Sequence, residues 1–329
     1  MNAAPVVATA LLCVWLGHRA VAAQPEKKAP PPPNIVFILA DDLGAGDLGC
    51  FNPDSKVPTP HLDKLARDGI RFTNAYCPDA VCTPSRYALM SGRYSWRSVH
   101  KAGVQGNWEK PLIEEGRLTL PALLQRAGYT TGGFGKWHIG AEFPTTDGRA
   151  PEGQGAHRHP RNGANLDLAQ PLAGGPLDRG FDAWYGFICT SESLVYEGRQ
   201  PVGLIDVYPA PLAAGADRLP AIPLSSYLDV VTDRSLAFID ARAADARAGR
   251  PFFLYCSPYV PHVPLAVPDA FKGRTRAGDY GDYVHALDHH VGRVFAALER
   301  HGLADNTLVV FASDNGSEFV TTGDGHRPT

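Results

Sequence analysis

The sequence predicts an α/β fold in which a central, mostly parallel sheet is flanked by helices. Three continuous apolar runs rich in branched and aromatic residues, at 34–40, 251–256 and 307–312, are typical of buried central strands. A fourth strand is predicted over 129–134. The stretch 282–301 carries an apolar stripe at helical spacing and lies between two of these strands. Strands that alternate with helices favour a parallel sheet.

Further helices are expected between the strands. They cover 61–68, 120–127 and 225–244. The segment 141–179 is rich in Gly, Pro, Arg and Asn and lacks periodicity, so we expect a long loop there. Loops of that length in a compact domain are usually functional or disordered.

The composition excludes some classes of partner. With 329 residues the chain can bury a sizeable core. Charged residues make up 20% of the chain and its net charge is −3, so nothing favours a nucleic-acid or anionic-membrane partner. Any basic character must therefore be local.

The first residues indicate export. Residues 1–23 are typical of a signal peptide, with an apolar stretch over 6–16 and small residues at 20–23 that suit signal peptidase. The apolar stretch is too short to span a bilayer, so we expect no stable membrane insertion. Residues 24–33, with a proline run, are expected to be a linker. These features predict a periplasmic or secreted protein.

The cysteines leave several possibilities open. Cys13 would be removed with the signal peptide. Cys50, Cys77, Cys189 and Cys256 allow three disulfide pairings, and free thiols are equally compatible with the sequence.

Polar residues directly follow four of the predicted strands. They are Asp41, Asp42, Lys136, His138, His262, Asp314 and Asn315. In open α/β sheets, ligands bind outside the carboxyl ends of the strands, which lie at one edge of a parallel sheet. We therefore expect these four clusters to meet, although each alone would pass for a turn or a packed side chain.

Four of these residues are candidate metal ligands. Asp41, Asp42, Asp314 and Asn315 offer only oxygen atoms, which suit a hard cation such as Ca²⁺ or Mg²⁺. Without a cation, three carboxylates at one strand edge would repel and raise one another's pKa.

The run from Cys82 to Arg93 predicts a helix that begins at an anion-binding site. Thr83 is expected to cap this helix, and Pro84 suits its first position. Cys82 would then lie at the positive end of the helix dipole, with Arg86 one turn further along.

The sequence of this run, Cys82-Thr83-Pro84-Ser85-Arg86 followed by 89–93, resembles the signature of the type I sulfatases, which belong to the alkaline phosphatase-like superfamily. Other segments resemble further motifs of that family in the same order. These are 34–44 with the paired aspartates, 135–138 with Lys136 and His138, 176–186, 261–262 with His262, and 313–316 with Asp314 and Asn315.

The resemblance implies roles for these residues. Cys82 would be oxidised by a formylglycine-generating enzyme to formylglycine, whose hydrate is the nucleophile and a ligand of the metal. Arg86 and Lys136 would stabilise the sulfate oxygens. His262 would protonate the leaving oxygen, and His138 would take a proton to expel sulfate.

The resemblance also implies that residues 34–329 are the N-terminal catalytic domain of such an enzyme, incomplete at the C-terminal end. Family members usually continue with another active-site lysine, a further sheet segment and a smaller C-terminal subdomain. We therefore expect an exposed sheet edge.

The predicted function is that of a sulfuric ester hydrolase, arylsulfatase-like, acting on a sulfate monoester of a sulfated carbohydrate. The alternatives are a phosphonate or phosphate monoester hydrolase of the same superfamily, and a non-catalytic sulfoglycan-binding protein or inactive fragment. Loop residues that could touch substrate are His157, His159, Arg149, Arg158 and Arg161. His285 and His289 have the spacing of a metal pair but no acidic partner, so we expect them, with His290, to be solvated or packed.

Overall fold

The computed structural model describes residues 31–157, 159–189, 194–205, 215–319, 322 and 325–328. The predicted signal peptide, most of the predicted linker and Arg158 lie outside these residues. Among the described residues, no helix combines the length and the apolar character needed to cross a bilayer.

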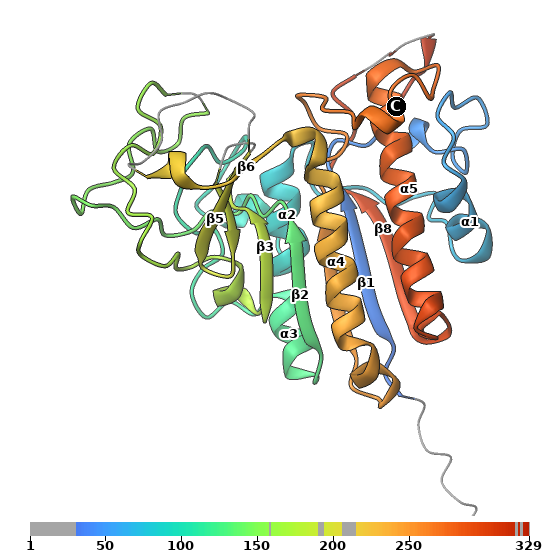
Figure 1. The fold of residues 1–329 in the computed structure, drawn as a ribbon, viewed down its shortest axis with the longest axis horizontal. Coiled ribbons are helices and arrows are strands. Elements are labelled where there is room, and N and C mark those ends of the chain that lie inside the picture. The colour runs from blue at the N-terminus through green and yellow to red at the C-terminus, as the bar shows by residue number, and fades with distance from the viewer. Residues whose placement is uncertain are drawn as a thin grey trace, which may run out of the picture. The chain divides into compact units, whose positions relative to one another are not determined.

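An eight-stranded sheet forms the centre of the described chain (Figure 1). Its order is β6-β5-β4-β3-β2-β7-β1-β8, and all neighbours are parallel except β4, which is antiparallel to both β3 and β5. The strands are β1 (Asn34–Ala40), β2 (Thr130–Gly135), β3 (Ala183–Phe187), β4 (Leu194–Glu197), β5 (Gln200–Ile205), β6 (Ala221–Ile222), β7 (Phe252–Ser257) and β8 (Thr307–Ser313). The predicted α/β fold with a mostly parallel sheet is confirmed.

Helices cover both faces of this sheet. They are α1 (Pro60–Asp68), α2 (Cys82–Ser91), α3 (Leu120–Arg126), α4 (Leu224–Arg247) and α5 (Gly278–Arg300). Short 3-10 turns lie at η1 (Ala45–Asp47), η2 (Ser95–Arg97), η3 (Pro176–Arg179), η4 (Ala216–Arg218), η5 (Asp269–Phe271) and η6 (Ala304–Asn306). Figure 1 shows α4 and α5 in front of the sheet and α2 and α3 behind it.

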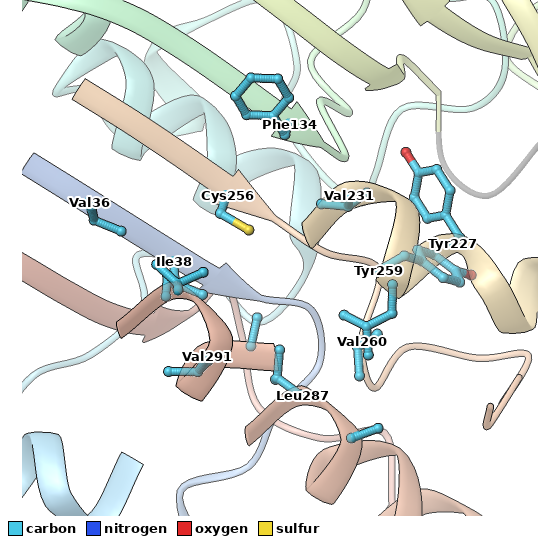
Figure 2. Packing of buried hydrophobic residues seen from close by; sticks show 14 of the residues in the cluster. Val36, Ile38, Phe134, Tyr227, Val231, Cys256, Tyr259, Val260, Leu287 and Val291 are labelled. Atoms are coloured by element: carbon cyan, nitrogen blue, oxygen red, sulfur yellow. The ribbon is translucent and has the colours of Figure 1, made fainter. Parts of the chain in front are cut away.

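Each face of the sheet carries its own apolar cluster, because successive side chains of a strand point to opposite faces. Val36 and Ile38 of β1 pack with residues of α4 and α5, such as Val231 and Leu287 (Figure 2). Leu39 belongs to the opposite cluster, together with residues of α2. Strands β1 and β7 are thus buried on both sides, which explains their continuous apolar runs.

Several local predictions were wrong. The N-cap of α2 is Val81, and no side chain caps the helix. The hydroxyl of Thr83 instead accepts a hydrogen bond from the amide of Gln105 at 3.0 Å, and Pro84 is the third residue of the helix. Helix α5 begins at Gly278, before the predicted start. Strands β3 to β6 were not predicted.

The predicted long loop, 141–179, lacks helices except η3 but packs firmly where it is described. Phe143, Leu166 and Leu172 belong to the apolar cluster on the α2 face. The side-chain oxygen of Asn162 accepts a hydrogen bond from the indole of Trp108 at 2.6 Å. The loop is therefore a wall of the core.

Two further features concern the surface and the cysteines. The outer side of β8 has no neighbouring strand in the described chain, and Leu308 is 53% exposed, as expected for an open sheet edge. Among the described cysteines, Cys50, Cys77, Cys82 and Cys256 are free thiols. The sulfur of Cys189 accepts a hydrogen bond from the amide of Trp108 at 3.3 Å.

Candidate active site

The four strands followed by the predicted polar residues are adjacent in the sheet, in the order β2-β7-β1-β8. Because they are all parallel, their carboxyl ends lie at one edge, and the polar residues gather there. Helix α2, on the face of the sheet opposite α4 and α5, brings Cys82 and Arg86 to the same edge (Figure 1). The sequence positions joined in this way span residues 41 to 315.

Arg86 lies at the centre of the cluster. Its side chain is fully buried, and Nη2 lies 3.1 Å from Asp41 Oδ1 and 2.8 Å from Asp314 Oδ2. Nε donates to the same oxygen of Asp314 at 2.9 Å, and Nη1 donates to Ser257 Oγ at 2.6 Å and to the carbonyl of Lys136 at 3.1 Å. One cation therefore joins the ends of β2, β7, β1 and β8.

Lys136 makes a second buried ion pair with Asp41. Its ammonium lies 3.0 and 2.8 Å from the two oxygens of that carboxylate, and both side chains are fully buried. Burial alone would raise the pKa of Asp41, but Lys136 and Arg86 outweigh it and hold the pKa of this carboxyl well below its usual value. Asp41 is therefore an anion between two cations.

The neighbouring carboxylates are less well compensated. Burial, and then the charge of Asp41, raises the pKa of Asp42. Burial raises the pKa of Asp314 to about 7, with Asp41 adding to the effect and Arg86 opposing it. A cation bound at this shared site would stabilise the ionised carboxylates and so lower these raised pKa values.

Several ligand atoms converge at this point. Asp41, Asp42, Cys82 and His262 each offer one atom, and these atoms lie within 4.8 Å of one another. Asn315 Nδ2 donates to Asp42, and its side-chain oxygen is buried with no hydrogen-bond partner among the residues that the structure describes. A buried oxygen without a donor, beside carboxylates with raised pKa values, fits a hard cation.

Cys82 is the first residue of α2 and is buried. Burial raises the pKa of its thiol to about 11, although Lys136 opposes the shift. The thiol is therefore protonated at neutral pH and is a poor nucleophile.

The backbone of two site residues is unusual. Asp42 has φ 63° and His138 has φ 56°, in the left-handed region that residues other than glycine seldom adopt. Such conformations persist where the surrounding structure imposes them, and they cluster at functional sites.

His138 is fully buried, and its Nε2 lies 2.9 Å from the carbonyl oxygen of Gln105. Because a carbonyl only accepts, Nε2 carries the proton and Nδ1 carries the lone pair. No hydrogen bond to Nδ1 is found among the described residues. Burial, and then Lys136, lowers the pKa of this imidazole well below its usual value, so His138 is a neutral acceptor.

His262 lies at the more open side of the cluster. Its side chain is 17% exposed, and Nε2 lies 3.6 Å from Asp42 Oδ2. His262 belongs to the proline-rich turn after β7. The buried residues Tyr259 and Val260 precede it in this turn. All the predicted site residues are thus brought together at one edge of the sheet.

A model of the Sulfatase family matches residues 33–328, almost all of the described chain. The chain belongs to the sulfatase family.

Individual relatives support this assignment. The chain is 37% identical to human arylsulfatase A over 295 residues, covering 89% of this chain and 54% of that protein. It is 31% identical to the N-acetylgalactosamine-6-O-sulfatase of Bacteroides thetaiotaomicron over 313 residues, covering 86% of this chain and 59% of the relative. This sulfatase-family chain therefore spans little more than half the length of these two curated relatives.

A solved structure has the same fold. It comes from work on the metabolism of multiple glycosaminoglycans by Bacteroides thetaiotaomicron, and it superposes with a TM-score of 0.75 and 28% identity. The match covers 91% of the sulfatase-family chain and 67% of that structure.

Two residues of the site were missed by the sequence analysis. Ser257 accepts the short hydrogen bond from Arg86, and Gln105 accepts that from His138. Ser257 is a polar residue at the carboxyl end of β7, just as Asp41 is at the end of β1. Its position could therefore have identified it as a site residue. Gln105 lies in an irregular segment, and nothing in the sequence marks its carbonyl group.

Other histidines and arginines of this sulfatase-family chain lie outside the cluster. His285 Nδ1 contacts the carbonyl of Pro58, and His290 Nδ1 contacts the hydroxyl of Thr232. The loop residues named as possible substrate contacts are exposed where they are described: Arg149, His157, His159 and Arg161.

Proposed function

We propose that this chain is the catalytic part of a sulfuric ester hydrolase that cleaves sulfate monoesters of sulfated carbohydrates. The observation that carries the proposal is the position of Cys82, whose ligand atom lies within 4.8 Å of those of Asp41, Asp42 and His262. Membership of the sulfatase family and the names of the two glycan- and aryl-sulfatase relatives support the reaction class.

The nucleophile is assigned to position 82 after conversion of Cys82 to formylglycine by a formylglycine-generating enzyme. The hydrated side chain supplies one hydroxyl that attacks sulfur and a second whose deprotonation expels sulfate. The unmodified thiol is protonated, and after an attack on sulfur it would leave a thiosulfate ester with no such exit.

The negative charge of the sulfate group is met by buried cations. Arg86 and Lys136 are held in place by Asp41 and Asp314, so they need no reorganisation when charge develops in the transition state. The metal site is assigned to Asp41, Asp42, Asp314, Asn315 and position 82. A Ca²⁺ or Mg²⁺ ion bound there would act as a Lewis acid toward the sulfate oxygens.

Proton transfers are assigned to the remaining residues. Asp314 is the acceptor for the attacking hydroxyl. His262, at the open side of the cluster, protonates the departing oxygen. His138 Nδ1, whose ring is neutral and which has no hydrogen-bond partner in the described part of the chain, takes the proton of the second hydroxyl.

Export to the periplasm or the exterior completes the proposal. It rests on the signal-like residues 1–23, and it places the enzyme where sulfated polysaccharides are found.

The proposal is tested by peptide mass spectrometry on the segment around Cys82, from protein made in its own host, together with sulfate release. We expect formylglycine at position 82 and loss of sulfate release in Cys82→Ala. Cys77→Ala is the matched control, because Cys77 is an exposed free thiol that does not belong to the group of converging ligand atoms.

Three outcomes would overturn it. Sulfate release that survives in Cys82→Ala excludes the assigned nucleophile. Faster hydrolysis of an aryl phosphonate monoester than of the matched aryl sulfate would favour the phosphonate hydrolase alternative, and formylglycine without turnover would favour a binding protein.

A further inference from the structure

A second polar site lies outside the catalytic cluster. A pocket of about 780 Å³ opens between the loop that follows η1, the helix α1 and the segment that precedes α5. None of the predicted catalytic or metal-binding residues lines it. It needs an explanation of its own.

The lining of this pocket is strongly basic. Its cations are Lys56, Arg67, Arg71, Arg274 and Arg276. Asp63 is the only carboxylate among the described residues that line it, and it already accepts hydrogen bonds from the amide of Cys50 and the hydroxyl of Thr59. Arg67 also lies 3.4 Å from the exposed carboxylate of Asp68. The chain as a whole has a net charge of −3, so this cluster is a local exception rather than a general property of the surface.

One wall of the pocket is held in place by Asp63. Its Oδ1 accepts from the amide of Cys50 at 2.8 Å and from Thr59 Oγ1 at 3.1 Å, and Thr59 in turn accepts from the amide of Gly49 at 3.1 Å. Arg71 donates to the carbonyl of Cys50. These bonds tie the loop to α1.

The opposite wall is held by Asp282, which is fully buried in the first turns of α5. Its two oxygens accept from the amides of Gly273 and Thr275, at 2.6 and 2.7 Å, so the arginines of this segment project from an anchored loop. A Cβ at Gly281 would lie 2.6 Å from Thr275 Oγ1 and 3.1 Å from Val57, which shows how closely the two walls approach. The charges are therefore preorganised rather than carried on free loops.

Both walls share an anchor with the catalytic cluster. The hydroxyl of Tyr280 lies 3.3 Å from the carbonyl of Asp42 and donates to Asp47 at 2.7 Å. Tyr280 belongs to the same end of α5 as the basic segment, and Asp47 precedes the loop of the other wall. The pocket and the candidate metal ligands thus lie at the same end of the sheet.

We propose that this pocket binds a sulfated polysaccharide chain outside the catalytic centre. Five cations spread along two anchored walls suit a ligand with several separated anionic groups, and a sulfated glycan is such a ligand. The choice of a sulfated glycan rests on the proposed function. The pocket would hold the polymer while one of its sulfate esters occupies the catalytic cluster.

The test measures binding without turnover. Arg274→Gln/Arg276→Gln is made in a Cys82→Ala background, and its affinity for dextran sulfate is compared with that for neutral dextran. We expect affinity for dextran sulfate to fall about ten-fold, with a weaker salt dependence, as for other polyanions that lose two charge contacts. Arg126→Gln/Arg247→Gln removes the same charge from exposed positions that do not line the pocket, and should change affinity less than about two-fold.

Turnover provides a second readout. In the Cys82-containing protein, the pocket variant should raise KM for a sulfated polymer and leave kcat/KM for a small aryl sulfate unchanged. Equal weakening by the control pair, or equally strong binding of single-stranded RNA that is lost in the same variant, would overturn the proposal. If no ester is hydrolysed, the proposed function fails, whereas a loss of dextran sulfate affinity confined to the pocket variant still supports the site.

Discussion

Two nitrogen atoms of the Arg86 guanidinium group contact the same oxygen of Asp314, Nε at 2.9 Å and Nη2 at 2.8 Å. Both side chains are fully buried. Since Asp41 accepts from the same Nη2, this planar group fixes the ends of β1 and β8 relative to each other. The geometry requires the planar, multiply donating group of arginine, which a lysine ammonium cannot replace.

Arg86→Lys is therefore expected to lower the free energy of unfolding by about 3 to 5 kcal/mol, because a lysine leaves a buried carboxylate without its partner. Denaturant unfolding measures the change. Arg93→Lys is the matched control: Arg93 pairs with the half-exposed Glu114 at 2.9 Å, and its loss should cost about 1 kcal/mol or less. Equal effects of the two substitutions would contradict the assigned role.

Gly135→Ala should be far more harmful than Gly148→Ala. Both glycines have positive φ, 114° and 68°, but a Cβ at Gly135 would lie 2.0 Å from the carbonyl oxygen of Ser257, whereas Gly148 faces open space. We expect about 1 kcal/mol for Gly148→Ala from backbone strain alone. For Gly135→Ala we expect a loss of at least about 3 kcal/mol, since β2 and β7 must move apart beside Lys136. Similar melting temperatures for the two variants would refute the close approach.

Calcium should stabilise the protein through the acidic cluster. At a hundredfold excess over Kd, binding to the folded state alone adds about 2.7 kcal/mol to the free energy of unfolding. Asp42→Asn should abolish most of the calcium-dependent rise in melting temperature. Asp54→Asn removes a carboxylate of the same type outside the cluster and should keep the rise in full. A calcium effect that persists in Asp42→Asn would place the ion elsewhere.

His262→Ala should slow the hydrolysis of esters with poor leaving groups more than that of esters with good ones. A general acid contributes about 10²- to 10⁴-fold to rate when the departing oxygen needs a proton. We expect a loss of this size for a sugar sulfate and a much smaller one for 4-nitrophenyl sulfate, whose leaving group departs as an anion. His285→Ala serves as control, because His285 contacts only the carbonyl of Pro58 and the ring of Phe271 among its described partners. Equal losses of hydrolysis rate for both esters would exclude His262 as the general acid.

His290 should make the fold sensitive to acid. Burial, and then Arg293 and His289, lowers the pKa of its imidazole to about 3, whereas Asp233 opposes the shift. The unfolded chain binds a proton near pH 6.5 that the folded chain does not, so stability falls as pH drops from about 6.5 toward 3. The slope approaches about 1.4 kcal/mol of unfolding free energy for each pH unit.

His290→Asn keeps a hydrogen-bonding group near Thr232 but cannot titrate. Its free energy of unfolding, measured from pH 7 to pH 4, should decline less steeply than that of the parent protein. An unchanged slope would show that His290 is not the acid-sensitive group.

The order and type of the main elements could be predicted because their signals are local. The strands around Val36, Leu254 and Val309 are continuous apolar runs, and the helix containing Leu287 and Val291 has a clear stripe. Strands β3 to β6 have no such signal. They are short, and β3 and β5 are interrupted by glycine or proline. They form because β2 offers an unpaired edge on which they add.

The candidate site divides in the same way. The residue types after each strand, and the rule that parallel strands end at one edge, were enough to predict that Asp41, Lys136, His262 and Asp314 would meet. The partners of each group were beyond that reasoning. That Arg86 binds Ser257, that Gln105 sets the tautomer of His138, and that Asp42 adopts a positive φ all depend on segments distant in sequence.

The sequence by itself thus determined the fold class, the family and the residues that gather at the sheet edge, since periodicity and motif order are properties of the chain. Tertiary structure alone decided the charge state of each group and the existence of the basic pocket. The physical reason is that burial and Coulomb interactions depend on distances between segments, and those distances exist only when the sheet and α5 have packed.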